Sequence, residues 1–442
     1  MPATTRPYVP ALIPFPARVV KRRLANGLSV VVVEAPHLHA TALALYVRTG
    51  SRYETARTNG LSHFVEHMLF RGSAAYPSSI ALNRAIEERC GMLCGETGRD
   101  YSLYQVRLHP RELDQVLFIF GDLFASPLFS DLELERAIVL EEILDDFDER
   151  GQRVNIDDVA RAEVWPGHPL GFPITGPKAN IRRFARTDVV AHFRRFYGGR
   201  NLVLAVAGPV ESSAVLASAK RALGGLPPGR PCTPRPAPRT VSGPRFRAVR
   251  TDSAQAEIQL LFRAFADNHP LYPALVTLLR LLDDGMATPL HYRVCDRKGL
   301  AYHVDAGLDP LADASLLEIS AACASEKLPE LVREILGILA ELREGPVAKA
   351  DLAKVKRRYA RDLESGFDDV EGLGAWFGDS LLFDRPLRTP TERFRRMAKV
   401  TAAQVQAVAR EVLRRENLVA AAVGGFAPSI ARKVRAIIRV FG

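Results

Sequence analysis

Two histidines and a glutamate stand close together early in the chain, in the order His63-x-x-Glu66-His67. If this segment is helical, residues four apart lie on one face, so His63 and His67 can bind the same metal ion. Glu66 projects to the same side. Zinc lowers the pKa of a bound water to about 7, and Glu66 could accept the proton that this water loses. The alternative is that His63 and His67 are ordinary histidines on a helix surface or in a core and bind no metal.

A catalytic zinc site usually has three protein ligands and one open position, so another helix must bring a third ligand. The acidic segment 134–143 offers Glu135 and Glu142, which are seven residues apart and share one helical face. Glu141 is turned away from Glu142 by about 100°, so we expect it to point to solvent. On the residues alone, a solvated acidic face is an alternative for all three glutamates.

The segment Gly60-Leu-Ser-His-Phe-Val-Glu-His-Met-Leu-Phe-Arg-Gly72 resembles the metal-binding segment of the pitrilysin, insulinase and mitochondrial processing peptidase family. The resemblance implies a zinc metalloendopeptidase of the inverted-motif type with one Zn²⁺ per chain. It implies that Glu142, 75 residues after His67, is the third zinc ligand. It also implies that Glu135 supports the catalytic site as a nearby carboxylate.

Three further segments are similar to the same family, and the resemblance runs from about residue 20 to about residue 425. They are His168-Pro-Leu-Gly171 continuing to Asn180-Ile181, Phe196-Tyr197 continuing to Gly208, and Arg297-Lys-Gly-Leu-Ala-Tyr302. Family members of this length have two related α+β domains per chain and form dimers that enclose a chamber. The resemblance therefore implies the short two-domain bacterial type.

The residue pattern also indicates duplication. Thr187 opens a helical pattern that ends in the strand-like run Asn201–Gly208, and Thr401 opens a similar one that ends in Asn417–Gly424. A Pro- and Gly-rich segment, residues 226–246, lies between the two copies. We therefore predict an α+β protein of two similar α/β-sandwich domains, each with a mixed, mostly antiparallel sheet and helices.

We expect the metal-binding domain at residues 18–225, the linker at 226–246, and a second domain without a metal motif at 247–442. Within the first domain, the pattern predicts strands at 28–33, 41–49 and 101–108. It predicts helices at 59–70 and 110–125, and a long acidic helix at 131–149. That acidic helix could favour basic peptides, or it could be an ordinary solvated face.

Two positions depart from the family pattern. Cys94-Gly95 stands where members usually carry an Asn-Ala pair on the edge strand that holds the substrate backbone. Strand addition uses main-chain hydrogen bonds, so Cys94 and Gly95 can still bind substrate. Seven residues before Tyr302, where the family has an Arg that binds substrate with the Tyr, this chain has Cys295. Tyr302 remains a predicted substrate-binding residue, with a packed aromatic as the alternative.

These features predict an endopeptidase that hydrolyses extended or unfolded peptides inside a dimeric chamber. Because Cys295 breaks the Arg-Tyr pair, we expect this chain to be the zinc-bearing subunit of a heterodimer whose paralogous partner supplies that pair. A non-catalytic scaffold or partner subunit is the main alternative. A metal-binding chaperone or peptide-binding module without turnover is a third class.

Composition excludes several other classes. The net charge of +10 is spread along the chain without a nucleic-acid motif, so we expect no nucleic-acid partner. Five scattered cysteines, with Cys90 and Cys94 at the wrong spacing for a C-x-x-C pair, indicate a reducing compartment. Residues 1–23 do not resemble a signal peptide, and no apolar run is long enough to insert in a membrane. We therefore expect a cytoplasmic protein.

Overall fold

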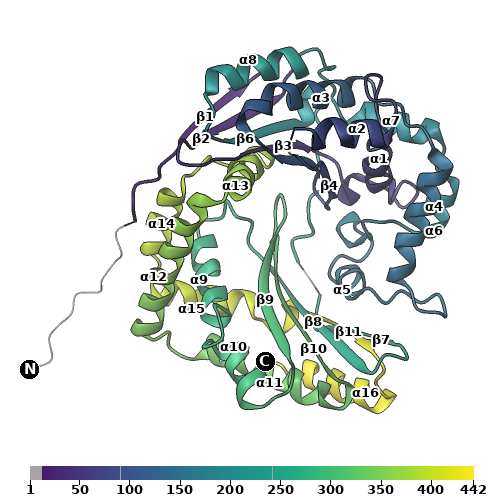
Figure 1. The fold of residues 1–442 in the computed structure, drawn as a ribbon. Helices are drawn as coiled ribbons and strands as arrows, with labels where there is room; N and C mark the ends of the chain where they lie inside the picture. The colour runs from purple at the N-terminus through teal and green to yellow at the C-terminus, as the bar shows by residue number, and fades with distance from the viewer. Residues whose placement is uncertain (1–11, 90, 241) are drawn as a thin grey trace, which may run out of the picture.

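The computed structural model describes residues 12–89, 91–240 and 242–442, and Cys90 therefore lies outside the described residues. The chain forms two sheets at opposite ends of the molecule (Figure 1). In spatial order, the first sheet consists of β1 (Arg18–Arg23), β2 (Ser29–Glu34), β6 (Leu202–Gly208), β3 (Thr41–Val47), β5 (Ser102–Leu108) and β4 (Cys94–Thr97). The second consists of β7 (Arg245–Arg250), β11 (Leu418–Gly424), β8 (Gln255–Ala264), β10 (Ser315–Ala324) and β9 (His303–Pro310).

The helices of the first half are α1 (Leu61–Leu69), α2 (Ser79–Glu87), α3 (Leu113–Ala125), α4 (Leu132–Glu142), α5 (Ile156–Val164), α6 (Lys178–Arg183), α7 (Arg186–Phe196) and α8 (Ser212–Leu223). Those of the second half are α9 (Tyr272–Leu282), α10 (Pro289–His291), α11 (Leu328–Glu344), α12 (Lys349–Ser365), α13 (Val370–Leu382), α14 (Pro390–Ala398), α15 (Ala402–Val412) and α16 (Pro428–Arg439). Within the described ranges, no helix is both long and apolar enough to cross a membrane.

The two sheets have the same topology once the edge strand β1 is set aside. In chain order, β2 to β6 of the first sheet correspond one by one to β7 to β11 of the second. In each sheet the last strand is inserted between the first two, parallel to the first strand and antiparallel to the second. The remaining pairs are antiparallel. The predicted α+β class and the predicted duplication are therefore confirmed.

Both faces of each sheet are buried, as the alternating side chains of β2 illustrate. Val30 and Val32 pack into one core with the helices α1, α3, α7 and α8. Val31 and Val33 pack into a separate core on the opposite face. Successive strand residues point to opposite faces, so a strand with no exposed side chains needs a covering layer on each side.

The second covering layer comes from the other half of the chain. α13 packs across β2, β6 and β3 of the first sheet, with Leu373 and Phe377 buried there. α13 carries a glycine at the contact, because a Cβ on Gly378 would lie 2.6 Å from the ring of Tyr46. In the opposite direction, α5 packs on β11, β8 and β7 of the second sheet through Val159, Val164 and their neighbours. The division at 226–246 stays a prediction, and the packing of these two helices crosses it.

The Pro-rich segment 226–244 contains no helix or strand in its described residues, and it contacts the first half at its start and the second half towards its end. Pro227 and Pro228 accept hydrogen bonds from the backbone N–H groups of Gly199 and Arg200. Further along, the backbone carbonyl of Arg235 accepts a hydrogen bond of 2.9 Å from Nε of Arg52. The linker is therefore packed against the rest of the chain and is not a free, flexible connection.

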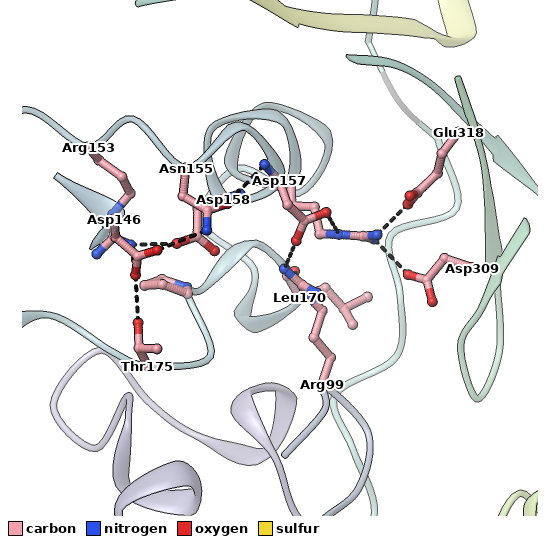
Figure 2. A network of polar contacts seen from close by, with 12 residues as sticks. Arg99, Asp146, Arg153, Asn155, Asp157, Asp158, Leu170, Thr175, Asp309 and Glu318 are labelled. Carbon is pink, nitrogen blue, oxygen red and sulfur yellow. Dashed lines mark hydrogen bonds and ion pairs between the residues drawn. The ribbon is translucent and has the colours of Figure 1, made fainter. Parts of the chain in front are cut away.

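Ion pairs join the halves where α5 meets the second sheet (Figure 2). Arg161 of α5 is buried and pairs with Asp157, with Asp309 at 2.7 Å and with Glu318. Asp157 also binds Arg99 of the first half at 2.8 Å. The chain of charges thus runs from the first half, through α5, to β9 and β10.

The prediction of an acidic helix over residues 131–149 is wrong beyond Glu142. α4 ends at Glu142, a 3₁₀ turn follows over Ile143–Asp146, and Phe147 pairs with Arg153 in a tight turn. The acidic side chains here take local hydrogen bonds instead of forming a helix face. Asp146 accepts from Asn155 and Thr175, and Asp148 accepts from two backbone N–H groups. Such local bonds compete with helix formation.

We expect Arg161→Met to lower the free energy of unfolding by about 3 kcal/mol, because it leaves the partner carboxylates without their cation. Equilibrium urea unfolding measures the change. Arg150→Ala is the matched control: Arg150 also bridges the halves, to Asp252, but the two side chains are 66% and 82% exposed. It should cost less than about 1 kcal/mol. Equal losses in the two variants would contradict this account.

Candidate functional site

The helix α1, which carries the histidine motif, has its N-terminus fixed by a buried glutamate. The carboxylate of Glu54 accepts hydrogen bonds from the backbone N–H of Gly60 (2.9 Å) and Ser62 (2.6 Å) and from the side chain of Asn59 (3.0 Å). Gly60 itself has φ 95°, and a Cβ there would lie 2.7 Å from the carbonyl of Thr175. Burial raises the pKa of Glu54, while these hydrogen bonds oppose the rise. Glu54 was not predicted from the sequence, because it lies further before the first residue of α1 than the N-cap position, where capping side chains are normally found.

The segment 168–181 supports the same end of α1. The side-chain amide of Asn180 donates to the carbonyls of Ala56 and Asn59, both at 2.9 Å. The amide of Asn59 donates to the carbonyl of Pro173 at 2.8 Å. The loop before α1 is therefore held from both sides, which sets the direction in which α1 presents its side chains.

The structure brings His63, His67 and Glu142 together. Nε2 of His63 lies 3.4 Å from one carboxylate oxygen of Glu142, and Nε2 of His67 lies 3.4 Å from the other. One ligand atom from each of the three residues lies within 4.8 Å of the other two, and no other group of three or more such residues occurs in the described residues. Glu141 is exposed, as expected.

These separations fit a zinc ion. Ligand atoms held about 2.0–2.1 Å from a tetrahedral ion are about 3.3 Å from one another. A distance of 3.4 Å is also longer than a typical N–H···O hydrogen bond, so the carboxylate makes only long hydrogen bonds to the two rings and leaves room for an ion between them. Two imidazoles and one carboxylate are a usual ligand set of catalytic zinc, which leaves one position open.

Glu135 orients one of the two imidazoles. Its Oε2 lies 3.1 Å from Nδ1 of His67, so Nδ1 carries a proton, and Nε2 is the nitrogen that gives up its proton when a metal binds. Glu135 is buried, and its other oxygen is bound by Arg71, a residue that sequence reasoning did not single out. Arg71 follows His67 by four residues, and this spacing is the sequence feature from which a position close to His67 could have been predicted. In the described part of the chain, Nδ1 of His63 has no such partner.

The carboxylates also determine the charge of the cluster. Burial opposes protonation of His67, but the hydrogen bonds to Glu135 and Glu142 outweigh it and raise the pKa to about 9. The hydrogen bonds from His63 and His67 hold the pKa of Glu142 well below its usual range, against the effect of burial. Burial raises the pKa of Glu135, but the bonds from His67 and Arg71 bring it below the ordinary value. Two ionised carboxylates therefore face His67.

Glu66 lies between α1 and the edge strand β4. One of its oxygens accepts a hydrogen bond of 2.8 Å from the hydroxyl of Thr97. The other faces Gly95, where an added Cβ would lie only 2.4 Å away. Glu66 is buried, and Cys94, the neighbour of Gly95 on β4, is half-buried. The predicted base and the predicted substrate strand are thus direct neighbours.

Tyr302 and Cys295 lie in the second half. Tyr302 is 99% exposed, just before β9, and Cys295 packs against the core of the second sheet. The far end of β9 turns into β10 through residues 311–314, and this turn contacts Asp100 and Arg52 of the first half. Tyr302 lies one strand length from that contact, roughly 25 Å away.

Comparisons with known proteins agree with this geometry. Residues 29–178 match the description insulinase (peptidase family M16), and residues 183–359 match the description peptidase M16 inactive domain. The chain belongs to the M16 peptidase family. An uncharacterized zinc protease of Mycobacterium tuberculosis is 29% identical over 424 residues, which cover 94% of this chain and 95% of that protein. Another from Bacillus subtilis is 24% identical, over 88% of this chain and 94% of the relative.

Solved M16 structures share the fold. A protease from Helicobacter pylori superposes with a TM-score of 0.85 at 21% identity, over 92% of this chain and 99% of that one. A protein titled peptidase M16 inactive domain, from Pseudomonas fluorescens, gives a TM-score of 0.82 at 20% identity, over 92% and 98% of the two chains. The family names support zinc and a protease class, and the predicted short two-domain form is confirmed.

We expect Glu142→Gln to weaken zinc binding by more than roughly 100-fold, because it removes a charged ligand. Glu135→Gln should weaken zinc binding by about 10- to 100-fold, because it affects only the orientation and basicity of His67. Competition with a chromophoric chelator measures both affinities. The control is Glu141→Gln, one residue away and exposed, which should leave the affinity unchanged. If this control loses zinc as severely as Glu142→Gln, the assignment of the third ligand is wrong.

Proposed function

We propose that this M16 protein is a zinc-dependent endopeptidase that binds one Zn²⁺ per chain through His63, His67 and Glu142. The observation that carries the proposal is the pair of 3.4 Å separations between the imidazole nitrogens and the two oxygens of Glu142. The relatives that are named zinc proteases support the same metal.

Bound zinc supplies a Lewis acid that activates water and polarises the scissile carbonyl. Glu66 accepts the proton from the attacking water and returns it to the leaving amine. The hydroxyl of Thr97 on β4 donates to one oxygen of Glu66, and the other oxygen faces Gly95 of the same strand, so β4 positions the base. Glu135 and Arg71 hold the ring of His67 in the tautomer that leaves Nε2 available.

The substrate in this proposal is an extended or unfolded peptide that adds to the free edge of β4. β4 is the last strand of its sheet, and it lies on the side of the first half that faces the second (Figure 1). Its outer main-chain groups can pair with a peptide backbone irrespective of side chains, so Cys94 and Gly95 serve there without the usual amide. Gly95 brings that backbone close to Glu66.

We further propose that the chain works as the zinc-bearing subunit of a dimer, with a paralogous partner that supplies an Arg-Tyr pair to a shared chamber. Cys295 in place of the Arg, and the remoteness of Tyr302 from the zinc ligands, support this division. The cytoplasm is the proposed compartment, because the described cysteines are all free. One solved relative is titled a periplasmic protease of Escherichia coli, so fractionation is the direct test.

A non-catalytic partner subunit is the second candidate. The match of residues 183–359 to the inactive-domain description and the loss of the Arg at Cys295 favour it. The two candidates differ in what Glu66 does, because only a peptidase needs a base beside the metal.

Glu66→Gln should retain zinc and lower peptide hydrolysis by about 10²- to 10⁴-fold, because the amide cannot accept the proton. The measurement is turnover of an unstructured fluorogenic peptide, by the chain alone and with its paralogue, alongside zinc content. A wild-type chain that holds zinc but shows no turnover in either form would support the non-catalytic subunit.

Gly95→Ala should also lower turnover, by at least about tenfold, because its Cβ would displace Glu66 or the ring of Phe70. Zinc content should stay at the wild-type value, since the nearest atoms to an added Cβ belong to Glu66 and Phe70 and not to a zinc ligand. Gly225→Ala is the control, since an added Cβ there meets nothing within 4 Å. Unchanged turnover in Gly95→Ala would show that β4 does not position the base.

A further inference from the structure

A second concave site lies on the first half, away from the metal ligands. Its walls are the end of α7, residues 52–56, the segment 167–172 and the linker residues 229–235, and its volume is about 980 Å³. This volume is within the range of small-molecule sites. No part of the proposed peptidase chemistry uses this cavity.

Arginines dominate the lining. Arg194 and Arg195 come from α7, and Arg230 and Arg235 come from the linker. All four are exposed, and among the described residues none forms an ion pair, although Arg195 lies over the ring of Phe196 and Arg235 donates to the carbonyl of Gly167. Four cationic groups therefore lie around one hollow.

The other charged groups at the cavity do not neutralise them. Glu54 is the acidic lining residue, and its carboxylate is fully used by the N-terminus of α1. Arg52, at the floor, is already bound to Asp100 and Asp313. The excess positive charge of the cavity therefore comes from the four unpaired arginines.

Neighbouring histidines are affected by this charge. Burial and the nearby Arg195 lower the pKa of His192 to about 3. Burial, with Arg235 and Arg52, also lowers the pKa of His168. Both rings are thus neutral at physiological pH and add no charge to the site.

We propose that this arginine cavity binds a small anion that carries two or more phosphate groups. Guanidinium groups bind phosphate oxygens with paired N–H···O bonds, and groups from two different elements suit a ligand with several phosphates better than a single one. The partly exposed rings of Tyr53 and Phe172 add an apolar wall for an organic group attached to the phosphates.

Such a ligand bridges the linker and the first half, because Arg230 belongs to the linker and Arg194 belongs to α7. It therefore strengthens an attachment that already includes the hydrogen bond from Arg52 to the carbonyl of Arg235. Binding should raise the melting temperature of the chain, since only the folded state assembles the four arginines.

Isothermal titration calorimetry on the full chain, at fixed ionic strength and without Mg²⁺, tests the proposal. The probes are inorganic phosphate, tripolyphosphate and adenosine triphosphate. We expect saturable one-to-one binding of tripolyphosphate, tighter than that of phosphate by at least about tenfold, because each charge-assisted hydrogen bond adds affinity. Tighter binding of adenosine triphosphate than of tripolyphosphate would identify a nucleotide as the class, and equal binding would identify the polyphosphate alone.

The variant Arg194→Ala/Arg230→Ala should lose at least about tenfold in affinity for tripolyphosphate. The control Arg247→Ala/Arg410→Ala removes the same charge from exposed positions on the second half and should change affinity by less than about twofold. Thermal melts without ligand verify that both variants are folded. Equal losses in the two variants, or the absence of saturable binding by all three probes, would overturn the proposal, and neither result depends on peptidase activity.

Discussion

The central strands of both sheets are buried on both faces, and each half of the chain supplies helices to only one face of its own sheet. The remaining face is covered by a helix from the other half, α13 on the first sheet and α5 on the second. Full burial of a large apolar side chain contributes about 1.5–3 kcal/mol, so Phe377, Leu373 and Leu381 alone make this exchange a large part of the stability. The two halves are therefore one cooperative structure, although their topologies are duplicates.

The candidate metal centre depends on that arrangement through α1. The helix is fixed at its start by Glu54 and Asn180 and is packed along its length into the first core. α4 then places Glu142 against the histidines and Glu135 behind one of them. The ligand atoms are thus held by two helices and a capped loop, which is the kind of rigid support that a catalytic site requires.

Much of this could be predicted from the sequence because its signals are local. The spacing of His63 and His67 predicts one helical face, and the structure places their ring centroids 4.6 Å apart. The repeated helix-strand pattern at Thr187 and Thr401 predicts the duplication, because each copy ends in the corresponding interior strand of its sheet. The class of zinc peptidase came from the resemblance to a known family, and the geometry is compatible with it.

The rest depends on contacts between residues far apart in the chain. Neither the exchange of α5 and α13 nor the cap from Glu54 has a periodic pattern. The acidic stretch after Glu142 has the composition of a helix, but Asn155 and Thr175 bind Asp146 and a turn follows instead. Such outcomes are decided by tertiary hydrogen bonds, which local propensity does not contain.

The exchanged helices also limit how the molecule can move. A wide opening of one half away from the other would pull α13 off the first sheet and α5 off the second, exposing apolar surface on both. The linker is fastened as well, so it cannot act as a hinge. In the peptidase dimer proposed above, a large peptide would therefore reach β4 when whole chains separate, rather than by a hinge motion within one chain.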